Sequence, residues 1–170
     1  MRILILGGGV MQLPAVRLAK ARGWTVAVAA AGIGPEIERL ADSCEWVDLR
    51  DREAVTRLAR DLSRQEKLDG VFTAGTDFST TVAWVAERLG LPGIPYEAAV
   101  AATDKARMRA AFQAHDVPSP RFFTVTDTEK AEAEGSGSKT LPATLPRGFF
   151  FPLVVKPVDN MGARGVRRVD

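Results

Sequence analysis

The chain has 170 residues, a net charge of +2, 46% hydrophobic residues and 26% charged residues. These values are typical of a globular protein that is long enough to bury a core. So small a net charge gives no reason to expect a nucleic-acid partner, and no apolar stretch approaches the roughly 20 residues of a membrane span. The cytoplasm is therefore the expected location.

The only cysteine, Cys44, excludes a disulfide framework and a thiolate metal cluster. Its position just before an apolar segment favours a packing role for the thiol. As the sole thiol in the chain, it also stays open as a catalytic candidate.

Short apolar runs alternate with amphipathic stretches over the first 95 or so residues. We expect strands at residues 2–6, 25–30, 46–49 and 69–73. We expect helices at residues 11–22, 35–41, 51–65 and 77–89. This alternation implies right-handed crossovers and a parallel sheet, and strands that are apolar on both faces imply helices on both sides. The predicted fold class is α/β, with a doubly wound, Rossmann-like parallel sheet in a first domain at residues 1–96.

The pattern changes after residue 96. Two helices are expected at 97–103 and 104–115, where Thr103 or Asp104 can cap the second. Three further strands are expected, at 121–126, 149–156 and 166–169. Residues 127–148 are acidic and then rich in glycine, serine and proline, so we expect a mobile insertion there. The second predicted domain covers residues 97–170.

Three glycines follow the first expected strand and open a helix, as in a dinucleotide-binding fingerprint. Gln12 stands at the third glycine position of that fingerprint, where its side chain would hinder the approach of a pyrophosphate. The strand at 25–30 also ends without a carboxylate for a ribose hydroxyl. Binding of NAD or FAD is therefore disfavoured. The turn still suits a small anion, which makes Gly8 and Gly9 candidate substrate-binding residues.

Thr76 and Asp77 follow the expected strand at 69–73. Ligands of open α/β sheets bind at the carboxyl ends of the strands, so these two side chains are further substrate-binding candidates. Alternatively, one of them simply caps the helix that follows. The two roles can coexist.

A second set of candidates surrounds two lysines. Lys156 ends an apolar strand, and a loop with two glycines follows at 157–165. Loop N–H groups can hold phosphate oxygens where glycine permits a close approach. Lys156 offers a compact cation and Arg164 a forked one, while Lys105 begins a helix from which it could reach the same polyphosphate. Considered alone, the loop could equally be a hairpin turn with charged tips.

These segments resemble the ATP-grasp superfamily. The resemblance rests on Thr103-Asp104-Lys105 at a helix start, Val117-Pro118-Ser119-Pro120, and Phe151–Pro157 followed by the glycine loop. The opening segment at 6–14 is similar to the pre-ATP-grasp domain of the carboxylate–amine ligases in that superfamily. The large subunit of carbamoyl phosphate synthetase and the amino-acid ligases are the most similar types. The second domain would then be an incomplete α+β ATP-grasp subdomain.

The resemblance also implies roles for individual residues. Lys105 and Lys156 match the two basic residues that contact the phosphates and hold the adenine side of the cleft. The loop that closes over the phosphates corresponds to Met161, Gly162, Ala163, Arg164 and Gly165. Ala163 stands where relatives often have glycine, which would stiffen the loop. The implied cofactors are ATP and Mg²⁺, and since the family's metal ligands lie further downstream, no metal ligand is assigned here.

The predicted function is that of an ADP-forming ligase, which activates a small carboxylate as an acyl phosphate for attack by an amine. The chain stops beside an expected strand, which would leave an open sheet edge. We therefore expect the N-terminal portion of a longer enzyme, inactive alone. The alternative is a non-catalytic, nucleotide-binding half of a split enzyme that needs a partner chain. An NAD(P)-binding Rossmann protein is the less favoured reading.

Overall fold

The computed structural model describes residues 1–125, 145–160 and 162–170. Met161 and most of the predicted insertion, residues 127–144, lie outside the described residues. The chain divides into two compact units, Met1–Val100 and Ala101–Asp170. None of the helices in the described ranges has both the length and the hydrophobicity needed to cross a bilayer.

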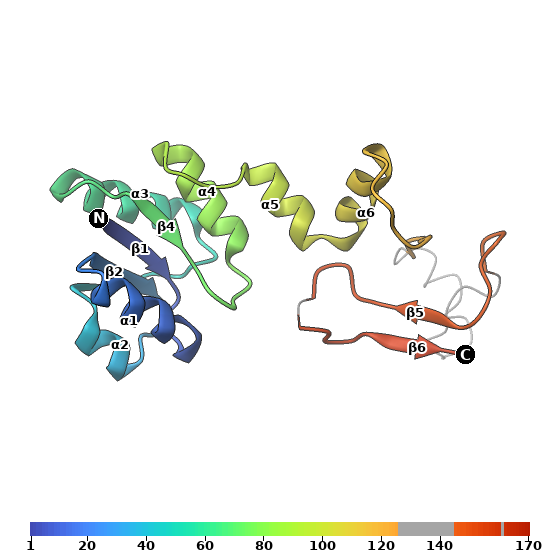
Figure 1. Cartoon of the computed structure of the whole chain (residues 1–170), viewed down its shortest axis with the longest axis horizontal. Helices are drawn as coiled ribbons and strands as arrows, with labels where there is room; N and C mark the ends of the chain where they lie inside the picture. The colour runs from blue at the N-terminus through green and yellow to red at the C-terminus, as the bar shows by residue number, and fades with distance from the viewer. Residues whose placement is uncertain (126–144, 161) are drawn as a thin grey trace. The chain divides into compact units, whose positions relative to one another are not determined.

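The first unit is built on a four-stranded parallel sheet (Figure 1). Its strands, in the spatial order β3-β2-β1-β4, pair in parallel throughout. Their bounds are β1 (Arg2–Leu6), β2 (Thr25–Ala30), β3 (Ser43–Trp46) and β4 (Gly70–Phe72). All four therefore end at one side of the sheet, which we call the carboxyl edge.

Helices cover both faces of this sheet (Figure 1). They are the 3-10 helix η1 (Val10–Gln12) and the α-helices α1 (Leu13–Ala21), α2 (Pro35–Leu40), α3 (Arg52–Gln65) and α4 (Ser79–Leu89). One face packs on α1 and α2, and the other packs on α3 and α4. The predicted doubly wound α/β fold is confirmed.

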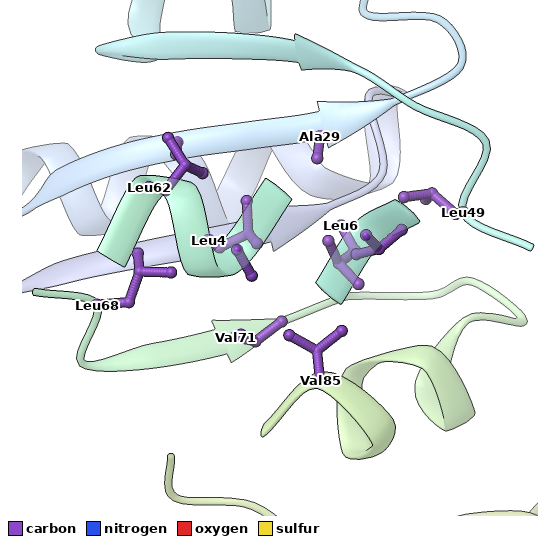
Figure 2. Close-up of a cluster of buried hydrophobic side chains, with 11 residues drawn as sticks. Leu4, Leu6, Ala29, Leu49, Leu62, Leu68, Val71 and Val85 are labelled. Carbon is purple, nitrogen blue, oxygen red and sulfur yellow. The ribbon is translucent and has the colours of Figure 1, made fainter. Parts of the chain in front are cut away.

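The two halves of the core follow from the alternation of side chains along β1. Ile5 points to the α1 and α2 side, whereas Leu4 and Leu6 point to the α3 and α4 side; all three are fully buried. Figure 2 shows the larger cluster, in which Leu4 and Leu6 meet Leu62 of α3 and Val85 of α4. Burial of each such side chain contributes about 1.5–3 kcal/mol to stability.

In the described part of the second unit, one helix and one pair of strands lie wholly within it, and α5 (Tyr96–Thr103) spans the boundary between the units. Helix α6 (Lys105–Ala114) begins at Asp104, whose Oδ1 accepts from the N–H of Arg107 at 2.9 Å. Asp104, rather than Thr103, therefore caps this helix. Strands β5 (Leu153–Val155) and β6 (Arg167–Val169) pair antiparallel.

Three predicted elements are wrong or displaced. The strand expected at 46–49 is β3, three residues earlier, because the end of β2 pairs with Ser43–Trp46. Residues 121–125 form no strand, since they pair with no other segment in the described part of the chain. The strand expected at 149–156 is confined to β5, where three residues face β6.

Arg2 is a buried charge that the sequence analysis did not single out. Its guanidinium donates from Nη1 to the carbonyls of Leu62 and Glu66, at 2.7 and 2.8 Å. The Leu62 carbonyl lies in the last turn of α3 and also accepts from the N–H of Glu66 at 3.1 Å, and Glu66 is the first residue after the helix. A cation there also interacts favourably with the helix dipole.

We expect Arg2→Met to lower the free energy of unfolding by about 2–3 kcal/mol, because two charged hydrogen bonds are lost. The exposed Arg64, which forms a salt bridge with Asp61 at 2.9 Å, provides the control. Arg64→Met should change stability by no more than about 0.5 kcal/mol. Urea unfolding of the 170-residue chain measures both, and equal midpoints for the two variants would contradict the assignment.

Candidate functional site

The glycine turn after β1 packs directly on the loop after β2. The N–H of Gly34 donates to the carbonyl of Gly8 at 2.8 Å. A Cβ atom built on Gly8 would lie 2.2 Å from the carbonyl oxygen of Gly32 and 2.7 Å from Cα of Ile33. Only glycine allows so close an approach of two backbones. Glycine at position 8 is thus required for packing, and its predicted contact with a substrate stays a prediction.

Gly9 differs from its neighbour. It is exposed, and a Cβ atom built on it would meet nothing within 4 Å. Its φ of −89° and ψ of 173° are extended backbone that any residue adopts. Gly9 therefore leaves open space beside the turn, on the carboxyl edge where the sequence predicts a small anion.

Gln12 links the turn to the loop after β4. Its side chain is only 1% exposed. Nε2 donates to the carbonyl of Ala74 at 2.6 Å, and Oε1 accepts from the N–H of Ala74 at 2.9 Å. The same side chain fills the space beside Gly7, where a built Cβ atom would lie 2.9 Å from Nε2. From the sequence, Gln12 is expected only as an obstacle to a dinucleotide. Its linking role has no local signal, because its partner is 62 residues away.

The loop after β4 carries the other two substrate candidates. Oγ1 of Thr76 accepts from the N–H of Phe78 at 3.3 Å and lies 2.7 Å from Oγ1 of Thr73. Helix α4 begins at Ser79 with Phe78 as its N-cap residue, so neither Thr76 nor Asp77 occupies the capping position. Asp77 is exposed and also makes an interaction.

Cys44 lies on β3 and packs against the α1 and α2 half of the core. Burial, and then the nearby carboxylates of Glu38 and Glu45, raise the pKa of the thiol above its usual value. Nucleophilic thiols need the opposite shift, towards the thiolate. The packing role predicted for Cys44 is therefore the better supported of its two alternatives.

In the second unit, Lys105 contacts the segment that follows Lys156. Its ammonium donates to the carbonyl of Asn160 at 2.5 Å and more weakly to that of Val158 at 3.4 Å. Its backbone N–H also donates to the Val158 carbonyl, at 3.0 Å. The start of α6 and the glycine loop, more than 50 residues apart in sequence, are thus held together.

The loop between β5 and β6 is closed at its base and open at its tip. A Cβ atom on Gly165 (φ +74°) would lie 2.8 Å from Cγ of Pro157, whereas one on Gly162 (φ +64°) would meet nothing within 4 Å. Ala163 adopts φ +57°, a left-handed conformation that costs a non-glycine residue roughly 1 kcal/mol. The stiffening expected from Ala163 stays a prediction.

The two remaining cations of this set lie on either side of the loop tip. Lys156 is exposed, and within the described residues it has no hydrogen-bond or salt-bridge partner. Arg164 is exposed and engaged in an interaction. Across residues 1–125, 145–160 and 162–170, no three His, Cys, Asp or Glu side chains gather as a metal site.

Residues 18–93 match the family model of the ATP-grasp N-terminal domain. The resemblance predicted from the lysine segments and the opening glycines is therefore confirmed at the level of the superfamily. No curated protein matches the chain closely enough to count as a relative.

Several solved structures are similar over nearly the whole chain. Phosphoribosylglycinamide synthetase from Anaerococcus prevotii is 27% identical, with a TM-score of 0.69, over 93% of this chain and 37% of that one. L-amino acid ligase from Bacillus licheniformis is 26% identical, with a TM-score of 0.73, over 99% of this chain and 39% of that one. The chain thus spans a little over a third of the length of either protein.

A third structure is similar in fold alone. It is the biotin carboxylase domain of the 2-oxoglutarate carboxylase from Hydrogenobacter thermophilus, in complex with MgADP, ADP and bicarbonate. It is 16% identical, with a TM-score of 0.64, over 98% of this chain and 37% of that one.

The contrast between two adjacent glycines provides a test of the turn. We expect Gly8→Ala to destabilise the chain by about 1–3 kcal/mol, because the new methyl group meets backbone that must move. Gly9→Ala enters open space at a compatible backbone conformation and should be neutral or slightly stabilising. Urea unfolding of both variants decides, and a Gly8→Ala variant as stable as Gly9→Ala would contradict the packing role.

Proposed function

We propose that this chain is the ATP-binding portion of an ADP-forming ATP-grasp ligase. In this proposal the whole enzyme transfers the γ-phosphoryl group of ATP to a small carboxylate. An amine then attacks the acyl phosphate and displaces phosphate. The proposal rests on the family of the N-terminal domain, and on the synthetase and the ligase that share this fold at 27% and 26% identity.

The observation that carries the proposal is the contact between Lys105 and the loop after Lys156. The Lys105 ammonium donates to the carbonyls of Asn160 and Val158, at 2.5 and 3.4 Å, in the loop that follows directly after Lys156. A polyphosphate needs several positive charges in one place, because its transfer depends on positioning and charge neutralisation.

The residues of this loop fit phosphate oxygens. Lys156 is exposed and has no partner in the described part of the chain, so its ammonium is available. The open space at Gly162 permits close approach to the backbone. Gly165 closes the loop base on Pro157, and Arg164 adds a second charge next to it. We assign the phosphates to Lys105, Lys156 and the loop from Met161 to Gly165.

The carboxylate substrate is proposed to bind at the carboxyl edge of the first unit. Gly8 and Gly9 form one side of this site, and Thr76 and Asp77 form the other. The turn and the β4 loop follow neighbouring strands, β1 and β4, which is where open α/β sheets bind their ligands.

Mg²⁺ belongs to the proposal through the family and through the neighbour crystallised with MgADP. The described residues of this chain bring no three acidic, histidine or cysteine side chains together. We therefore assign no Mg²⁺ ligand to them.

The reaction class predicts the products. The enzyme that contains this chain should release ADP and phosphate only when a carboxylate and an amine are both present, since the amine must displace the phosphate. Screening panels of acids and amines for ADP release measures this. Release of AMP and pyrophosphate would contradict the proposal.

Lys156 provides a test on the chain itself. We expect Lys156→Ala to weaken ATP binding by about 1–3 kcal/mol, as loss of a hydrogen bond from a charged group predicts. Titration calorimetry of the 170-residue chain measures the affinity. Lys67, whose side chain is 85% exposed in the first unit, gives the control variant Lys67→Ala. Equal affinities for the two variants would remove Lys156 from the site.

A further inference from the structure

The buried side-chain amide of Gln12 forms two hydrogen bonds with the backbone of a single residue. Its Oε1 and Nε2 pair with the N–H and the C=O of one residue, Ala74, at 2.9 and 2.6 Å. The side chain is 1% exposed, so both bonds are shielded from water. Loss of either bond would leave a buried polar group without a partner, at a cost of about 1–3 kcal/mol.

A chain of hydroxyl groups reinforces this link. Oγ1 of Thr73 donates to the carbonyl of Leu6 at 2.6 Å, and a carbonyl can only accept. The hydroxyl proton of Thr73 is thus donated to Leu6, so in the 2.7 Å contact between the hydroxyls of Thr73 and Thr76, Thr76 must be the donor. The hydroxyl proton of Thr76 is thus donated to Thr73, and the Thr76 oxygen accepts from the N–H of Phe78.

The hydroxyl of Thr76 is consequently a poor donor to a carboxylate, because donation would break the bond to Thr73. The donors that this loop can offer are backbone N–H groups. Those of Gly75 and Thr76 have no partner within the described residues. Their positions depend on where Ala74, the residue before them, is held.

Met11 adds a packing contact to the same link. A Cβ atom on Gly75 would lie 2.7 Å from Cε of Met11, so the two residues are in close contact. Gly75 has φ +60°. Residues of η1 thus hold the β4 loop at Ala74 by hydrogen bonds and at Gly75 by packing.

We propose that Gln12 is a positioning residue of the carboxylate site: it fixes the N–H groups of Gly75 and Thr76 opposite the glycine turn, so that both sides bind one carboxylate. The inference rests on the proposed function, since it concerns the same site. Gln12 itself does not touch the substrate, because both of its amide groups are engaged by Ala74.

The test uses the ¹⁵N-labelled 170-residue chain with acetate as the probe and an equal concentration of chloride as the ionic control. We expect acetate to shift the amide resonances of Gly9, Gly75 and Thr76 along one binding curve. Gln12→Met should raise the Kd for acetate roughly fivefold and speed the hydrogen exchange of the Ala74 amide. Gln65→Met, at an exposed glutamine of the same unit, should behave as the unchanged chain.

Gln12→Glu separates positioning from a general loss of packing. A buried carboxyl group beside a carbonyl has a raised pKa, and when protonated it can both donate to and accept from Ala74 as the amide does. At about pH 7.5 this variant should bind acetate as weakly as Gln12→Met, and at about pH 5.5 it should recover. Gln12→Met should show no such recovery. If Gln12→Met does not fold, the comparison of acetate binding by Gln12→Glu at the two pH values is sufficient to test the role of Gln12.

The outcomes separate the two proposals. Unchanged acetate affinity in Gln12→Met, or no recovery of Gln12→Glu at the lower pH, overturns the role of Gln12 and leaves the carboxylate site standing. Absence of any acetate shift at Gly9, Gly75 and Thr76 in the unchanged chain overturns both.

Discussion

The arrangement of the carboxyl edge depends on one contact between two backbones. Gly8 lies so close to Gly32 that a single methyl group between them would overlap with the Gly32 carbonyl, 2.2 Å away. The turn after β1 therefore packs on the loop after β2. Because η1 starts two residues after Gly8, this packing also determines the positions of Met11 and Gln12 in η1. The loop after β4 is then held by those two side chains.

This use of a glycine run differs from that in dinucleotide-binding proteins. There the glycines let the backbone approach a pyrophosphate and a strand pack on a helix. Here Gly8 serves the contact with a neighbouring loop, and Gln12 fills the space beside Gly7. The same strand–turn–helix context therefore produces a different arrangement of backbone and side chains at the carboxyl edge of the sheet. The glycine spacing alone does not distinguish the two, but the side chain at position 12 does.

The elements that could be predicted from the sequence are those with strong local signals. Strands β1 and β2 were predicted with their observed bounds, because each is a continuous apolar run between turn residues. Helices α3 and α6 start after Asp51 and Asp104, each of which accepts a backbone N–H as a capping residue. The two acidic caps are visible in the sequence, since the acceptor and the donor lie three residues apart.

The predictions failed where the structure depends on distant partners. A strand at 121–126 is expected from the extended backbone that the preceding prolines favour. A strand forms, however, only where another segment pairs with it through hydrogen bonds. β3 starts three residues before the predicted strand because Ser43–Glu45 pair with Ala27–Ala29 of β2, a partner that the local pattern does not reveal. The hydrogen bonds made by the side chains of Arg2 and Gln12 join residues about 60 positions apart, so no local sequence pattern predicts them.

The phosphate site is a proposal from a resemblance, and the bonds of Lys105 add a constraint that the resemblance lacks. An ammonium group has three N–H donors. Lys105 already directs its ammonium to Asn160 and, at a longer distance, to Val158. One donor therefore remains for a phosphate oxygen if the loop keeps its position, and a second becomes available only if the weaker bond at 3.4 Å is given up. The three N–H groups of Lys105 must therefore be shared between the loop carbonyls and a nucleotide. A change in the position of the loop would change how many of them a nucleotide can use.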